Sequence, residues 1–95
     1  MSIHQPLVSI GIPTYNRPAG FRRALQDITS QTYQNLEIIV SDNHSPESET
    51  AQIAHEFMEQ DSRIQYFRQA TNVGIFNNYQ FLLAQAQRRI FRLVL

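Results

Sequence analysis

Residues 7–13, with the sequence Leu-Val-Ser-Ile-Gly-Ile-Pro, decide the fold of this chain. The run is short, largely apolar and β-branched, which is typical of a strand buried in a sheet. Pro13 ends it, because proline has no N–H to give to a strand ladder. We therefore predict a buried strand over residues 7–13.

Beyond this strand the spacing of the apolar residues changes from that of a strand to that of a helix. Pro18 suits a first helical turn, where a missing N–H costs no intrahelical hydrogen bond. Helical spacing predicts an apolar face made of Phe21, Ala24, Leu25 and Ile28. Residues 36–40, Leu-Glu-Ile-Ile-Val, then repeat the buried-strand pattern.

A second helix is predicted to start at Ser45. The Ser45 hydroxyl can cap it, Pro46 needs no donor partner, and Glu47 puts an acid in the first turn. Its apolar face is predicted to be Ile53, Ala54, Phe57 and Met58. Residues 64–67, Ile-Gln-Tyr-Phe, form a third and shorter strand candidate.

The last part of the chain predicts a third helix, with an apolar face made of Phe76, Tyr79, Leu83 and Ala86. Residues 89–95 are a fourth strand candidate, for which a helix end is the alternative. Alternating strands and helices predict an α/β, Rossmann-like three-layer sandwich with a mostly parallel sheet and right-handed crossovers. Residues 1–95 are interpreted as one domain or part of one.

Composition narrows the classes of partner. Of the 95 residues, 42% are hydrophobic, and eight basic residues, all arginines, balance eight acidic ones. The balanced net charge therefore does not favour nucleic acid or an anionic membrane surface as a binding partner. The chain has no cysteine for a disulfide or a thiolate metal site. It also has no apolar run of signal-peptide or membrane-span length, so a cytoplasmic location is expected.

Three loops follow the predicted strands, and ligands of open α/β sheets bind at the carboxyl ends of the strands. The loops are residues 13–17, 41–45 and 71–74. Tyr15 offers a face for a nucleobase, and Asp42 can accept from a base N–H or a ribose hydroxyl. Asn72 and Gly74 allow a polar contact and close backbone approach. The candidate nucleotide-binding residues are Pro13, Thr14, Tyr15, Asn16, Arg17, Asp42, Asn43, Asn72 and Gly74.

Each of these residues also has a purely structural interpretation. Tyr15 can cover a helix end, Asp42 can close an Asx-turn, and Gly74 can supply a positive φ. Their joint position at three strand ends favours the binding site. Other sites fail on spacing: the dinucleotide fingerprint is missing, the phosphate loop needs a lysine that the chain lacks, and the three histidines form no metal-ligand pattern.

Four blocks carry a resemblance to a known family. They are Val-Ser-Ile-Gly-Ile-Pro-Thr-Tyr-Asn-Arg at 8–17, Gln-Thr-Tyr at 31–33, Glu-Ile-Ile-Val-Ser-Asp-Asn at 37–43 and Asn-Val-Gly at 72–74. The chain resembles the N-terminal, nucleotide-binding half of a family 2 glycosyltransferase, an inverting class with the GT-A fold. The resemblance implies a nucleotide diphosphate sugar as ligand and a role in cell-wall or polysaccharide biosynthesis. It puts Pro13, Tyr15 and Arg17 in the nucleotide-binding loop, Asp42 on the base or ribose, and Asn72 and Gly74 in the same pocket.

The sequence departs from the family pattern near its end. The family holds a divalent cation, Mg²⁺ or Mn²⁺, on an Asp-rich cluster after the third helix, and its base is a later carboxylate. No acid follows Asp61 here, so the cation ligands and the base are absent from this chain. The expectation is a GT-A domain truncated after about the third helix or the fourth strand and inactive alone.

The alternative to this expectation is a non-catalytic truncated module that acts through self-association or a partner chain. The C-terminal strand edge would supply the contact, because a strand without later neighbours exposes unpaired backbone and apolar side chains. The residues of this edge are Ile90, Phe91, Leu93, Val94 and Leu95.

Overall fold

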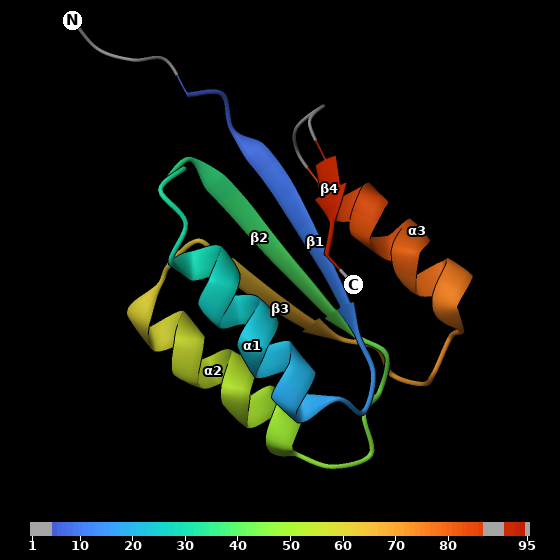
Figure 1. The fold of residues 1–95 in the computed structure, drawn as a ribbon. Helices are drawn as coiled ribbons and strands as arrows, with labels where there is room; N and C mark the ends of the chain where they lie inside the picture. Colours follow the sequence, from blue (N-terminus) through green and yellow to red (C-terminus); the bar gives the residue numbers. More distant parts are fainter. Residues whose placement is uncertain (1–4, 87–90, 95) are drawn as a thin grey trace, which may run out of the picture.

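The computed structural model describes residues 5–86 and 91–94, and the other residues are outside the description. Four strands and three helices alternate along the chain (Figure 1). Their bounds are β1 Val8–Thr14, α1 Pro18–Thr29, β2 Leu36–Asp42, α2 Glu49–Gln60, β3 Ile64–Arg68, α3 Ile75–Gln85 and β4 Phe91–Leu93. The fourth strand candidate is therefore confirmed over three of its seven residues.

The strands form one parallel sheet in the order β3-β2-β1-β4. Helices α1 and α2 cover one face of this sheet and α3 covers the other (Figure 1). The predicted three-layer α/β architecture is confirmed. The chain moves outward from β1 to β3 and then returns to the other side of β1, so the strand order reverses between β1 and β4.

The face beneath α1 and α2 is the main apolar core. Alternate residues of β1 and β2 point into it, as the period of a strand requires. The predicted helix faces are confirmed here, since Phe21, Leu25 and Ile28 of α1 and Ile53 and Ala54 of α2 are buried. The cluster consists of Ile10, Ile12, Phe21, Leu25, Ile28, Leu36, Ile38, Val40, Ile53, Ala54 and Ile64.

The opposite face of the sheet, beneath α3, is partly polar. Ser9 Oγ donates to Glu37 Oε1 at 2.6 Å, and both residues are buried. Ser41 Oγ donates to Asn78 Oδ1, and Asn78 Nδ2 donates to the Ser41 carbonyl at 3.1 Å. Apolar contact on this face comes from the rings of Phe67 and Phe81, 5.3 Å apart, and from the buried Ile39 and Leu82.

Two sequence predictions on the helices are wrong. The second helix begins at Glu49 after Ser48, not at Ser45, because the Ser45 hydroxyl is already bonded to Asp42 and the Asn16 N–H. The predicted apolar face of the third helix is also displaced. Phe76 and Leu83 are 69% and 52% exposed, and the buried positions are Asn78 and Leu82.

The strand ends also differ from prediction by one or two residues. β1 continues through Pro13 to Thr14. Gly11 of β1 accepts from Val94, whereas Thr14 accepts from Asn43 beyond β2. The backbone groups of successive strand residues point to opposite neighbouring strands, so the backbone of Pro13, like that of Gly11, points toward β4. The pairing of β1 with β4 ends at Leu93, which lies opposite Gly11. The missing N–H of Pro13 therefore removes no ladder hydrogen bond.

The prediction of an exposed apolar edge at the C-terminus is wrong for Val94. Val94 packs against the apolar core, whereas Leu93 is 37% exposed. Ile90, Leu95 and the side chain of Phe91 lie outside the described residues. Within the described ranges, no helix is long and apolar enough to cross a membrane.

Candidate functional site

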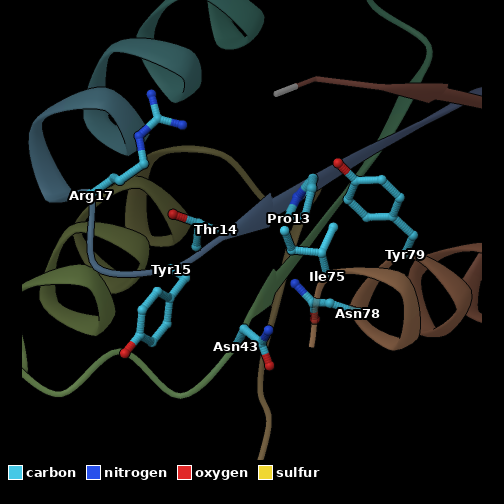
Figure 2. Close-up of a pocket in the computed structure, with 8 residues that line it drawn as sticks. All are labelled: Pro13, Thr14, Tyr15, Arg17, Asn43, Ile75, Asn78 and Tyr79. Atoms are coloured by element: carbon cyan, nitrogen blue, oxygen red, sulfur yellow. The ribbon is translucent and has the colours of Figure 1, made fainter. Parts of the chain in front are cut away.

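A cavity of about 250 Å³ opens at the carboxyl end of β1, where the strand order reverses. One side consists of the end of β1 and the loop after it, and the other side is the start of α3 (Figure 2). Open α/β sheets bind their ligands at this position. The lining residues are Pro13, Thr14, Tyr15, Arg17, Asn43, Ile75, Asn78 and Tyr79.

Tyr15 stands at the rim of the cavity with 45% of its surface exposed. The next residue, Asn16, has a φ of 50°, a left-handed conformation that asparagine tolerates better than most residues. The Asn16 N–H donates to Ser45 Oγ at 2.8 Å. This bond ties the loop after β1 to the loop after β2.

Asp42 lies beneath the loops and is 1% exposed. Its Oδ1 accepts from the Ser45 N–H at 3.0 Å and from Ser45 Oγ at 2.7 Å. Its Oδ2 accepts from the Tyr66 hydroxyl at 2.7 Å. Burial and this hydrogen bond to Asp42 raise the pKa of Tyr66 well above its ordinary value. The Asp42 side chain therefore bonds the backbone N–H three residues on, one residue further than in the Asx-turn that the sequence allowed.

Asn43 connects all three loops and reaches the cavity. Its N–H donates to the Thr14 carbonyl at 2.9 Å, and its Oδ1 accepts from the Val73 N–H at 2.8 Å. Because Val73 provides a donor, Oδ1 must face it, and the amide nitrogen Nδ2 is left as a donor on the cavity side (Figure 2). Further along the third loop, Asn72 Oδ1 accepts from the Gly74 N–H at 2.9 Å.

Gly74 has a φ of 88° and precedes the first residue of α3. Helix α3 supplies three cavity residues that the sequence predictions missed, namely Ile75, Asn78 and Tyr79. One signal could have found them: a helix that starts directly after the third loop must place its first turns at the same sheet edge. The spacing of apolar residues alone predicts a helical face that excludes Asn78.

Arg17 supplies the positive charge at the cavity. Its guanidinium lies over Gly20 in the first turn of α1, where a Cβ would come within 3.1 Å of Nη2. The side chain is exposed, and no carboxylate in the described ranges forms a salt bridge with it. The guanidinium is therefore available to an anionic ligand.

Five predicted site residues, Pro13, Thr14, Tyr15, Arg17 and Asn43, line the cavity together. Four others do not line it. Asn16 and Asp42 hold the first two loops through Ser45, whereas Asn72 and Gly74 form the turn that leads into α3. The cavity therefore combines an aromatic face, hydroxyl and amide groups and one cation.

This architecture, a parallel α/β sheet with helices on both faces and a cavity at its switch point, is shared by solved glycosyltransferases of the GT-A fold. The family model for "Glycosyl transferase family 2" matches residues 9–94. The chain therefore belongs to glycosyl transferase family 2. This assignment confirms the resemblance and favours it over the alternative of a non-catalytic module.

Individual proteins support the assignment. The chain is 37% identical over 62 residues to GalNAc(5)-diNAcBac-PP-undecaprenol beta-1,3-glucosyltransferase of Campylobacter jejuni, covering 65% of this chain and 20% of the relative. It is 35% identical over 77 residues to glycosyltransferase GlyA of Streptococcus pneumoniae, covering 74% and 11%.

Among solved structures, the mannosyltransferase PcManGT of Pyrobaculum calidifontis, in complex with GDP-Man and Mn²⁺, has a similar fold. It aligns with a TM-score of 0.79 at 23% identity, over 88% of this chain and 25% of the neighbour. The chain thus spans a quarter or less of each of these proteins.

Proposed function

We propose that the cavity binds the nucleoside diphosphate part of a nucleotide diphosphate sugar, and that the chain serves an enzyme transferring this sugar to an acceptor hydroxyl with inversion. The observation that carries the proposal is the position of the cavity at the switch point, between Tyr15 and α3. The family assignment gives independent support.

Each lining group has a role in this proposal. The Tyr15 ring stacks on the base, and Asn43 Nδ2 and the Thr14 hydroxyl donate to ligand oxygens. The Arg17 guanidinium pairs with the diphosphate. Pro13 forms the cavity wall, and Asn16, Asp42, Asn72 and Gly74 hold the loops in place.

The finer substrate classes also belong to the proposal. PcManGT was solved with GDP-Man, and the Campylobacter relative is named for an undecaprenol-linked acceptor. These names support a nucleotide sugar as donor and a cell-wall or polysaccharide precursor as acceptor. The cytoplasmic location stays a prediction.

The residues that the structure describes do not fit a divalent cation such as the Mn²⁺ in the PcManGT complex. No group of three His, Cys, Asp or Glu side chains that could hold a metal exists in residues 5–86 and 91–94. The cavity lining contains no carboxylate. No step of the proposal therefore depends on a cation held by this chain, and its own role is to bind and orient the nucleotide.

Titration calorimetry with uridine and guanosine diphosphates tests the proposal. One of the two should bind, and Tyr15→Ala should weaken that binding by about 1 to 3 kcal/mol, the scale of a lost base stack. Leu83→Ala, an exposed position on α3 away from the cavity lining, is the matched control and should bind normally.

The same titration with a chelator present should change affinity by less than about twofold, because no carboxylate lines the cavity. Purified chain incubated with a nucleotide sugar should release no sugar above background. A parent chain that binds neither nucleotide, or a Tyr15→Ala variant that binds like the parent, would overturn the proposal.

A further inference from the structure

We propose that Tyr66, Asp42 and Ser45 are positioning residues that set the orientation of Tyr15 in the nucleotide cavity. The inference rests on the proposed function, because it assigns these residues a role in nucleotide affinity. It differs from the role expected for Asp42 from the family resemblance, which was direct contact with the base or ribose.

A continuous chain of hydrogen bonds joins β3 to the loop that contains Tyr15. The Tyr66 hydroxyl donates to Asp42 Oδ2 at 2.7 Å, and the Ser45 hydroxyl donates to Asp42 Oδ1 at 2.7 Å. Ser45 Oγ in turn accepts from the Asn16 N–H at 2.8 Å. The path thus runs from Tyr66 through Asp42 and Ser45 to the backbone beside Tyr15.

The burial of these groups makes the chain of bonds selective for one geometry. Asp42 and Ser45 are each 1% exposed, so water cannot replace a lost partner without rearrangement. Both oxygens of Asp42 accept hydrogen bonds from protein donors. Asp42 therefore acts on a ligand through Ser45 and the loop after β1.

Tyr15 depends on this anchor because its own side chain is not held. In the part of the chain that the structure describes, the Tyr15 hydroxyl makes no hydrogen bond, and 45% of the residue is exposed. The backbone at Asn16 then determines where the Tyr15 ring points. The left-handed φ of 50° at Asn16 is unfavourable for a residue with a Cβ, so the bond to Ser45 stabilises a conformation that the loop alone would populate less.

Two variants break the path while keeping the packing: Tyr66→Phe removes one of its bonds, and Ser45→Ala removes both bonds of the Ser45 hydroxyl. Ser45→Ala removes the acceptor of the Asn16 N–H, and Tyr66→Phe removes the donor to Asp42 but keeps the ring that packs at 5.8 Å against His55. The matched control is Tyr33→Phe, which removes the tyrosine hydroxyl that donates to the Pro6 carbonyl, away from the cavity.

Calorimetric titration with the nucleoside diphosphate that binds the parent is the test. We expect Ser45→Ala to weaken binding by about tenfold and Tyr66→Phe by about threefold, with Tyr33→Phe unchanged. The thermal midpoint of each variant shows that it is folded. The effects should disappear in a Tyr15→Ala background, since the chain of hydrogen bonds acts on the nucleotide through the Tyr15 ring.

The Tyr15 ring resonances, followed by NMR without ligand, give a second readout. They should shift in Ser45→Ala and Tyr66→Phe and stay constant in Tyr33→Phe. A parent chain that binds no nucleotide overturns the proposed function and this inference with it. If the parent binds and the folded Ser45 and Tyr66 variants bind equally well, only the role of this chain of hydrogen bonds is overturned. The same holds if the two variants lose as much affinity in the Tyr15→Ala background as in the parent.

Discussion

The two faces of the sheet differ in what holds their helices. Under α1 and α2 the contacts are those of an apolar cluster of eleven buried side chains. Under α3, buried polar pairs interrupt the apolar contact, since Ser9 bonds Glu37 and Ser41 bonds Asn78. Parallel sheets are usually apolar on both faces. The polar face is also the face whose helix forms a wall of the cavity.

This difference separates two tasks. Apolar burial is not directional, so it stabilises a fold without fixing the exact position of a helix. Hydrogen bonds between buried groups require one geometry. Asn78 lines the cavity and makes two hydrogen bonds to Ser41. The polar face therefore holds α3 in the position that forms the cavity wall, while the apolar face supplies most of the stability.

The largest effect should come from the apolar face. Ile38→Ala removes a fully buried side chain from the centre of the cluster and should lower the free energy of unfolding by about 2 to 5 kcal/mol. Urea denaturation followed by circular dichroism measures the change. Leu83→Ala, at a 52% exposed position, is the control and should change little. Equal losses in both variants would contradict the assignment of the core.

An intermediate effect is expected on the polar face. Asn78→Asp keeps the acceptor for Ser41 Oγ but places an oxygen against the Ser41 carbonyl, which should cost about 1 to 3 kcal/mol of stability. Nucleotide affinity should fall as well, because α3 shifts against the sheet. Gln80→Glu, an exposed position on the same helix, controls for the added charge. A loss of stability with unchanged nucleotide affinity would show that Asn78 does not hold α3 in the position that forms the cavity wall.

The smallest effect should come from a charge pair at the start of β3, away from the cavity lining. Hydrogen bonds from the Arg63 side chain hold the pKa of Asp61 below its ordinary value. The stabilisation is therefore complete above the ordinary pKa of 3.8 and is lost as pH falls through the lower, folded value. At pH 7, Asp61→Asn should lower stability by about 1 kcal/mol.

Denaturation curves at pH 7 and at pH 3 measure this difference between parent and variant. The difference should be smaller at the lower pH, because it narrows once the pH falls below 3.8 and the unfolded Asp61 binds a proton. Glu56→Gln, which breaks an exposed pair with Arg22, should show no resolvable loss at pH 7. A gap between parent and Asp61→Asn that stays constant with pH would rule out the charge as its source.

The apolar face of the sheet could be predicted from sequence, but the polar face could not. Residues 7–13 and 36–40 are short apolar runs, and Phe21, Leu25 and Ile28 repeat with helical period, so strand, helix and burial follow from local pattern. On the other face, the burial of Ser41 and Asn78 depends on a pairing between residues 37 positions apart. Periodicity carries no signal for such a pair.

The site shows the same limit. The loop after β1 could be placed because ligand sites follow the carboxyl ends of strands, and its residues do line the cavity. The local pattern predicts a helix cap at Ser45, because a serine before Pro46 fits that pattern. Its actual partners are Asp42 and the backbone of Asn16, 29 positions away in the sequence. A tertiary contact therefore decided the role of this residue.

The position of β4 beside β1 has a consequence for the order of folding. Ser9 pairs with Phe91, more than 80 residues later, whereas β1, β2 and β3 are joined by much shorter crossovers. Closing the longer loop costs more chain entropy and slows the step that requires it. During refolding, β1 to β3 with α1 and α2 can therefore assemble before β4 pairs with β1. Because α3 must cross to the other face before β4 can pair, the cavity between β1 and α3 is completed late, after the apolar core has already formed.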